Sequence, residues 1–162
     1  MLGRDRTTKY DASMEKFIEV IEQYCTFPAL EKMKLFRLVL FNFLVGNEDA
    51  HLKKFTLISR NGKVELSPAY DLLNSTIVLR GKNIEELALP LGGKKRKITS
   101  ALLIQYYGKE RLKLTDKTIQ QVFSELKMAF PVWFQLLNIC FLSEDLKEKY
   151  KKILTDRRAI LQ

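Results

Sequence analysis

The stretch FNFLVGNEDAHLKKFTLISRNGKVELSPAYDLLNS, residues 41–75, decides the fold of this chain. Near its middle stands Asn61-Gly62, the dipeptide that a two-residue type I′ turn favours because both central residues need positive φ. A turn there makes Leu57 face Leu66, and the alternation of apolar and polar side chains then agrees on both arms. The stretch therefore predicts a β-hairpin with one apolar face.

The hairpin is also expected to bring two distant acidic residues together. Phe55 and Pro68 are predicted to face each other at its open end and to share its apolar face. Asp49 stands shortly before Phe55, and Asp71 stands shortly after Pro68. Because neighbouring strands lie about 4.8 Å apart, the two segments that carry these carboxylates become neighbours. The sequence therefore predicts a polar site that contains both aspartates.

Two motifs flank the hairpin in an order that protein kinases use. Kinases place a catalytic-loop Asp, a short hairpin and a metal-binding Asp one after another. The chain reads Gly46-Asn47-x-Asp49-x-His51-Leu52-Lys53-x-Phe55 and then Leu66-x-Pro68-x-Tyr70-Asp71. From about Lys9 to its end, the chain resembles the C-terminal domain of the HipA-like serine/threonine kinases, the toxin half of bacterial toxin–antitoxin pairs.

The resemblance implies a role for each site residue. Asp49 resembles the catalytic aspartate that accepts or orients the proton of the substrate hydroxyl, and Asp71 resembles the aspartate that holds the metal. His51 and Tyr70 resemble neighbours that line the nucleotide site. The implied activity is ATP-dependent phosphoryl transfer to a Ser or Thr hydroxyl of a protein substrate, with ATP and Mg²⁺ as cofactors.

One position departs from the family pattern. Where the family usually carries Asn at the nucleotide site, directly after Lys53, this chain has Lys54. Asn offers a carbonyl oxygen to Mg²⁺, whereas an ammonium has no lone pair to donate and repels the cation. Two interpretations stay open. Either Lys54 pairs with Asp71 and supplies the charge of a second metal ion, or the site is weakened or inactive.

A kinase also needs an N-terminal lobe, with a loop that covers the phosphates and a lysine that grips them. No Gly-rich loop precedes Asp49, so we interpret the chain as an excised fragment, part of a split gene or a remnant that binds ATP weakly alone. The resemblance implies three partners: an N-terminal lobe or its separate subunit, an antitoxin and a protein substrate, with DNA reached only through the antitoxin. The alternative function is a catalytically silent module that docks an N-lobe protein, an antitoxin or DNA.

Length and composition indicate one globular domain over residues 1–162. Hydrophobic residues make up 46% of the chain and charged residues 29%, as in folded rather than disordered proteins. No apolar run approaches the ~20 residues that span a bilayer, and the N-terminus shows no secretory signal, so we expect a cytoplasmic protein. The formal charge of +9 suggests an anionic partner, although the lysines are spread along the chain as on an ordinary basic surface.

The cysteines argue against two other kinds of site. Cys25 and Cys140 lie in apolar helical patterns and are expected to be buried free thiols. Such faces disfavour a reactive thiolate, which speaks against a Cys–His–Asp hydrolase. One histidine and two distant cysteines are also too few ligands for a zinc site.

Apolar spacing predicts a mainly α fold with one β-hairpin, an α+β class that resembles the helical C-terminal lobe of a protein kinase. Helices are expected over 14–25 and 28–45, from Thr99 or Ser100 to Gly108, from Thr115 to Pro131, from Pro131 after a kink or new start, and from Ser143. Residues 1–11 are expected to form an irregular lead-in, 76–79 and 87–91 short extended segments, and 92–97 an exposed basic loop.

Overall fold

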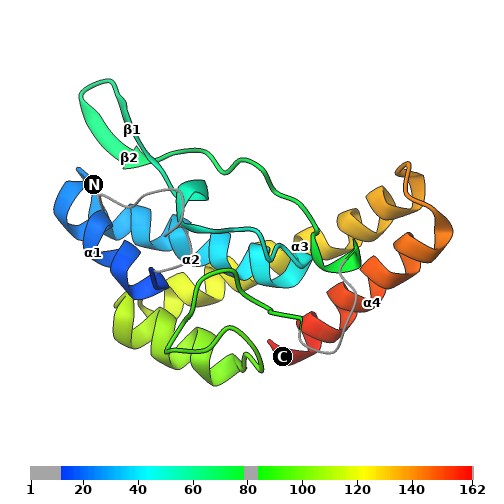
Figure 1. Ribbon diagram of the computed structural model, residues 1–162. Helices are drawn as coiled ribbons and strands as arrows, with labels where there is room; N and C mark the ends of the chain where they lie inside the picture. The colour runs from blue at the N-terminus through cyan, green and yellow to red at the C-terminus, as the bar shows by residue number, and fades with distance from the viewer. Residues whose placement is uncertain (1–11, 79–83, 162) are drawn as a thin grey trace.

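A helix that is apolar nearly all round, α2 (Pro28–Val45), forms the centre of the fold (Figure 1). The computed structural model describes residues 12–78 and 84–161, so the predicted lead-in over 1–11 lies outside the described residues. The side chains of Leu35, Phe36 and Phe43 on α2 are fully buried, because a helix without a polar face packs against neighbours on all sides. Neither α2 nor any other helix of the described residues is long and apolar enough to cross a membrane.

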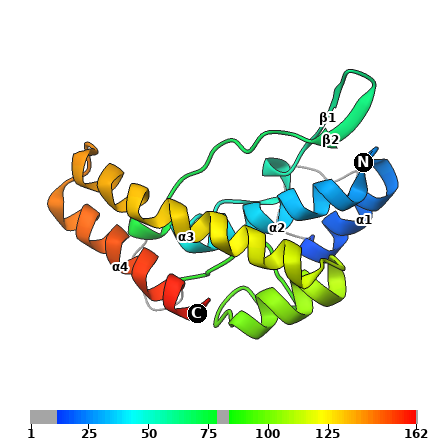
Figure 2. The same cartoon turned by 180° about the vertical axis from the view of Figure 1, so that it is seen from behind.

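The other elements surround α2. In chain order they are α1 (Met14–Tyr24), η2 (Leu52–Lys54), β1 (Leu57–Arg60), β2 (Lys63–Leu66), η3 (Thr76–Val78), η4 (Leu102–Arg111), α3 (Asp116–Ile139) and α4 (Glu144–Ile160). α2 contacts α1, β2, α3 and α4. The hairpin projects from the end of the molecule near α1, and α3 and α4 lie side by side toward the other end (Figures 1 and 2). The mostly helical fold with one antiparallel hairpin confirms the predicted α+β class.

Local capping signals predict the helix starts correctly. Ser13 accepts a hydrogen bond from the N–H of Lys16 at the start of α1, and Thr115 accepts one from the N–H of Thr118 at the start of α3. Pro28 is the first residue of α2, where its missing N–H costs no helical hydrogen bond. These signals act within one turn of chain, which is why the sequence suffices to read them.

The hairpin has the predicted register. Leu57 pairs with Leu66, and the strands remain in step up to the turn. Asn61 and Gly62 have φ angles of 52° and 72°, the positive values that a type I′ turn requires. The turn dipeptide therefore sets the register, as predicted.

The open end of the hairpin differs from the prediction. Beyond the paired strands, the N–H of Ser67 still donates to the carbonyl of Thr56 at 2.8 Å. Phe55 is then buried, with its ring centroid 5.4 Å from that of Phe17, whereas Pro68 is exposed. The expectation that Phe55 and Pro68 share one apolar face is therefore wrong. Proline has no N–H with which to continue the ladder, and only the phenyl ring is drawn into the core.

The helix predicted to stop at Gly108 continues beyond it as the π-helical segment η4. The segment is capped as predicted, with the N–H of Leu102 donating to the Thr99 hydroxyl at 3.2 Å. A Cβ on Gly108 would lie 3.2 Å from the Phe36 ring and 3.3 Å from Ile119. The glycine therefore allows η4 to pack closely on α2 and α3, and it does not end the helix.

Pro131 does not begin a new helix. Of the two possibilities predicted for this residue, a kink or a new helix start, the second is therefore wrong. α3 continues through the proline to Ile139. Phe130 and Trp133 pack against each other across it, with ring centroids 4.9 Å apart, and Arg158 of α4 lies 4.8 Å above the Phe130 ring. Contacts within α3 and with α4 thus stabilise the helix where local preference favours an interruption.

The two predicted extended segments are also wrong. Of the segment predicted over 76–79, residues 76–78 form the single 3₁₀ turn η3, and residue 79 lies outside the described residues. Residues 87–91 are largely buried but form no strand, and the bridge recorded for this part of the described chain joins Leu91 to Lys94. A short apolar run becomes a strand only beside a partner edge, and no neighbouring strand lies next to this run in the described structure.

The thiols are free in the described structure, as predicted, but only Cys25 is buried. Burial raises the pKa of the Cys25 thiol to about 11, which keeps the sulfur protonated and unreactive near neutral pH. Cys140 is half-buried, which corrects the expectation for that residue, and its Sγ lies 3.2 Å from the Leu137 carbonyl oxygen.

Candidate functional site

The loop that follows α2 is held by the buried residue Asn47. The N–H of Asn47 donates to the Asn42 carbonyl at 2.9 Å, and its Nδ2 donates to the Asn42 Oδ1 at 3.1 Å. Both bonds tie the loop to the last turn of α2, beside Gly46, which leaves the helix with a φ of 80°. The first residues of the loop are therefore held in place by the end of α2.

The same Asn47 side chain joins the two acidic segments. Its Oδ1 accepts the N–H of Asp49 at 3.2 Å, and its Nδ2 lies 3.5 Å from the carbonyl oxygen of Asp71. The loop of Asp49 and the segment of Asp71 therefore meet in one cluster, although their catalytic roles stay predictions. The sequence analysis gave Asn47 no role of its own. Its position between Gly46 and Asp49 was the feature that could have indicated one.

His51 is buried and caps the single turn η2. Its Nδ1 accepts the N–H of Lys53 at 3.3 Å, and its carbonyl accepts the N–H of Lys54 at 2.9 Å. An accepting Nδ1 leaves the proton of a neutral imidazole on Nε2. The structure thus gives His51 a capping role, while its predicted contact with a nucleotide stays a prediction.

Asp71 is joined to η2 by its side chain. Its carboxylate pairs with the Lys54 ammonium, which is the contact that one of the two interpretations of Lys54 predicts. The neighbouring Tyr70 donates its hydroxyl to the Lys53 carbonyl at 2.6 Å. Asp71 also has a φ of 54°, a left-handed conformation that is uncommon for residues other than glycine and is enriched at functional sites.

Hydroxyl groups of η3 and of Ser75, the residue before it, stabilise the loop. The N–H of Glu48 donates to the Ser75 Oγ at 2.8 Å, and the Thr76 Oγ1 lies 2.9 Å from the Gly46 carbonyl oxygen and 2.8 Å from the Glu48 Oε1. Burial raises the pKa of the Glu48 carboxyl, and the hydrogen bond from Thr76 opposes this only in part. Burial at the loop therefore disfavours the charged form of the Glu48 carboxyl.

α4 braces the end of α2 through Arg157, which is buried. The Arg157 Nη1 donates to the Phe43 carbonyl at 2.5 Å, and the guanidinium carbon lies 5.3 Å from the centre of the Phe43 ring. The Phe43 carbonyl also accepts the N–H of Gly46 at 3.3 Å, so Arg157 adds a second, charged donor at the end of α2. Burial lowers the pKa of Arg157, while the charges of Glu86 and Glu48 oppose that shift.

The residues around Asp71 fit a magnesium ion poorly. Among the residues that the structure describes, no group of three or more His, Cys, Asp and Glu side chains is placed to hold a metal. Mg²⁺ is usually held by one or two carboxylates together with substrate phosphates. The Asp71 carboxylate instead pairs with Lys54, whose ammonium donates hydrogen bonds and offers no lone pair.

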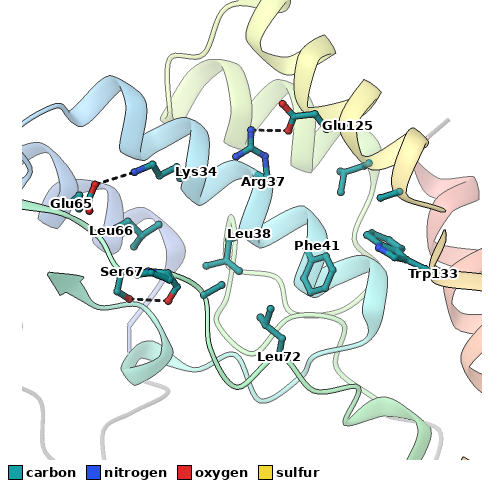
Figure 3. A pocket seen from close by; sticks show the side chains of 14 residues that line it. Lys34, Arg37, Leu38, Phe41, Glu65, Leu66, Ser67, Leu72, Glu125 and Trp133 are labelled. Carbon is teal, nitrogen blue, oxygen red and sulfur yellow. Dashed lines mark hydrogen bonds and ion pairs between the residues drawn. The ribbon is translucent and has the colours of Figure 1, made fainter. Parts of the chain in front are cut away.

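A pocket of about 510 Å³ lies between α2, α3 and the segment that follows β2 (Figure 3). Leu72, the neighbour of Asp71, lines it together with Phe41 and Trp133, whose rings meet edge to face at 5.4 Å. Two ion pairs border the pocket: Arg37 with Glu125 at 2.7 Å and Lys34 with Glu65 at 3.5 Å. Its volume and apolar lining suit a small ligand or a hydrophobic side-chain group. No local sequence signal predicts it, because three distant segments form it.

A family model and two curated bacterial proteins match the chain. Residues 1–133 match the model of the HipA-like C-terminal domain. The chain is 32% identical over 78 residues to the Sinorhizobium fredii protein named "Putative kinase Y4mE", and 30% identical over 95 residues to a Haemophilus influenzae protein named "Putative kinase". These alignments cover 46% and 54% of this chain, and 19% and 28% of the two relatives.

A solved structure has the same fold. The chain superposes with a TM-score of 0.71 on a chain from the Shewanella oneidensis toxin–antitoxin complex of HipA, HipB and operator DNA, at 23% sequence identity. The superposition covers 96% of this chain but only 38% of the other chain. This chain therefore spans a minor part of the proteins that it matches.

Proposed function

The chain belongs to the HipA-like C-terminal domain family, and from this premise we propose that it is the C-terminal catalytic lobe of a serine/threonine protein kinase. In this proposal the chain, residues 1–162, is a single lobe that acts together with an N-terminal lobe on the same or a separate polypeptide. The reaction is transfer of the γ-phosphoryl group of ATP to a Ser or Thr hydroxyl of a protein. The proposal is supported above all by the two hydrogen bonds of the Asn47 side chain, which tie the Asp49 loop to the Asp71 segment.

In this mechanism, Asp49 acts on the substrate hydroxyl. Its carboxylate orients the hydroxyl and accepts the proton while the oxygen attacks the γ-phosphorus and the bond to the β–γ bridging oxygen breaks. Asn47 holds the backbone of Asp49 in place before the substrate arrives, which lowers the entropic cost of alignment. His51 and Tyr70 line the nucleotide in this proposal, beside η2 and the Asp71 segment.

The proposed partners follow from the same family. The solved HipA structure contains the protein HipB and its operator DNA. We therefore place this chain in a toxin–antitoxin system, with an antitoxin protein as its partner and DNA reached through that antitoxin. The cell compartment that suits such an assembly is the cytoplasm.

The kinase proposal is tested by supplying an N-terminal lobe. The chain is co-expressed with the N-terminal region of a HipA-like protein, and phosphorylation is followed with γ-labelled ATP. We expect labelled protein with the wild-type chain and with Asp156→Asn, which changes an exposed residue of α4. Asp49→Asn should abolish the label, and equal labelling of this variant contradicts the role given to Asp49.

A catalytically silent binding module is the second candidate. The Lys54–Asp71 ion pair and the apolar pocket of about 510 Å³ favour it. The occupant of the pocket is then the N-terminal region of a HipA-like protein, because the chain spans only 38% of the HipA-system chain that it matches. In this case the N-terminal region binds equally well after Asp49→Ala and Asp71→Ala together, and the wild-type complex shows no phosphorylation.

A further inference from the structure

We infer that the Lys54 ammonium takes the place on the Asp71 carboxylate that a divalent cation occupies in magnesium-dependent phosphotransferases. The chain therefore binds no such cation at Asp71 while Lys54 is in place. This inference deepens the proposed function and rests on it in one respect, namely the metal-holding role that the family resemblance gives to Asp71.

The ion pair is partly shielded from solvent. The side chains of Lys54 and Asp71 are 21% and 35% exposed. Fully exposed ion pairs are weak and are readily screened by salt, whereas a pair with this burial is screened less. The ammonium is therefore a competitor that a cation from solution has to displace.

Both ends of the pair are fixed by other contacts. Lys54 belongs to η2, where its N–H donates to the His51 carbonyl at 2.9 Å. Asp71 is held through its carbonyl oxygen, 3.5 Å from the Asn47 Nδ2. Between them, the Tyr70 hydroxyl donates to the Lys53 carbonyl at 2.6 Å. Because contacts other than the ion pair already hold the two backbones, the ion pair forms with little further loss of backbone freedom.

The chemistry of the two cations explains why they exclude each other. Mg²⁺ requires oxygen ligands in near-octahedral geometry and gives up its water reluctantly. Lys54 stands where the family resemblance places an Asn carbonyl oxygen, so the site loses one ligand and gains a positive charge. Among the described residues, no group of three or more acidic, His or Cys side chains is placed to hold a metal ion and so to compensate for both changes.

The test measures cation binding without nucleotide and without an N-terminal lobe. The ¹⁵N-labelled full chain is titrated with Mn²⁺, and paramagnetic broadening of the amide signals of residues 70–72 is followed. We expect no site-specific broadening in the wild-type chain. We expect the Lys54→Asn variant to bind Mn²⁺ at these residues at least about tenfold more tightly than the wild-type chain does. Changing one residue around a metal site typically alters metal affinity by about this much or more. Adding Asp71→Asn to that variant should remove the gain.

Lys53→Asn is the matched control, because Lys53 is the neighbouring exposed lysine of η2 and contributes only backbone contacts to the site. It should leave the wild-type spectrum and its Mn²⁺ response unchanged, and the same spectra report whether each variant folds. The inference is overturned if wild-type protein shows broadening that Asp71→Asn removes, or if folded Lys54→Asn gains none. Either result is independent of the phosphorylation assay, and a negative phosphorylation assay does not change the conclusion from Mn²⁺ binding.

Discussion

Gly46 combines two properties: it ends α2 in a left-handed conformation, and it packs closely against other residues. Its φ is 80°, and a Cβ there would lie 2.9 Å from both the Asn74 Oδ1 and the Thr76 Oγ1. The sequence explains the first property, since glycine commonly ends a helix in the left-handed conformation. The close packing exists only because the segment of Asn74 and η3 folds back onto the loop. A side chain at this position is therefore expected to strain the left-handed backbone and also to clash with its neighbours.

We predict that Gly46→Ala lowers the free energy of unfolding more than Gly93→Ala does. Gly93 has a similar φ of 73° but nothing within 4 Å of its would-be Cβ, so its substitution costs only the left-handed backbone strain of about 1–2 kcal/mol. Gly46→Ala should cost roughly a further 1–3 kcal/mol for overpacking. Urea denaturation of both variants measures the difference, and equal values would show that η3 yields without cost.

Glu48 allows a prediction about pH at the same scale. Because burial raises its pKa in the folded protein, the folded state binds a proton at Glu48 more tightly than the unfolded chain does. The stability from this group is complete below the unfolded pKa and is lost as the pH rises through the folded pKa. At neutral pH the charged carboxylate therefore destabilises the fold.

Glu48→Gln should consequently raise the melting temperature near neutral pH and have little effect below about pH 4, where the carboxyl is largely protonated. The amide keeps the shape of the side chain and an acceptor for the Thr76 hydroxyl. Thermal unfolding followed by circular dichroism at both pH values measures the effect. Glu110→Gln, at an exposed position of η4, serves as control, and a lower melting temperature of Glu48→Gln at neutral pH contradicts the expected sign.

At the scale of elements, α4 contributes to the site although it lies outside the residues matched by the family model. That match ends at residue 133, within α3. The Arg157 side chain nevertheless reaches the last turn of α2 and donates a hydrogen bond to the Phe43 carbonyl. The helix that carries the loop of Asp49 is therefore held from its C-terminal end by the last helix of the described structure.

We predict that Arg157→Met lowers the free energy of unfolding by about 1–3 kcal/mol, because the buried carbonyl of Phe43 loses its charged donor. Arg158→Met is the matched control. Arg158 is half-buried and stacks on the Phe130 ring at 4.8 Å, a contact whose loss should cost about 0.5–1 kcal/mol. Hydrogen exchange locates the effect, since Arg157→Met should speed exchange at the end of α2. Uniform exchange in both variants would argue against a local brace.

At the scale of the whole molecule, the pocket in Figure 3 lies beside the segment that carries Asp71. Leu72 lines it at 43% exposure, whereas the next residue, Leu73, is 53% exposed and lies outside it. The floor is formed by α2 and α3, so an occupant would contact the core helices and the Asp71 segment together. An occupant of the pocket would therefore contact the residue next to Asp71.

We predict that Leu72→Asp weakens binding of a HipA-like N-terminal region by tenfold or more, because a carboxylate in an apolar contact loses its hydration without gaining a partner. Leu73→Asp should change the affinity much less. Isothermal titration calorimetry with the purified N-terminal region gives both values. Comparable losses in the two variants would show that the pocket is not the contact surface.

The sequence predicted those features that depend on a few neighbouring residues. Asn61-Gly62 set the hairpin register, Ser13 and Thr115 set helix starts, and Gly46 ended α2. The hairpin also indicated that the segments of Asp49 and Asp71 lie close together. It did not reveal Asn47 as their connection, because a buried amide shows its partners only once the chain has folded.

The sequence by itself determined the helical class, the hairpin and the set of polar residues around it, because backbone preferences and apolar periodicity act over one or two turns of chain. Only the tertiary structure decided that Phe55 enters the core without Pro68 and that η4 continues past Gly108. Only the tertiary structure also decided that Lys54 pairs with Asp71. Each of these outcomes depends on which distant side chains compete for the same space or charge, and sequence spacing does not encode that competition.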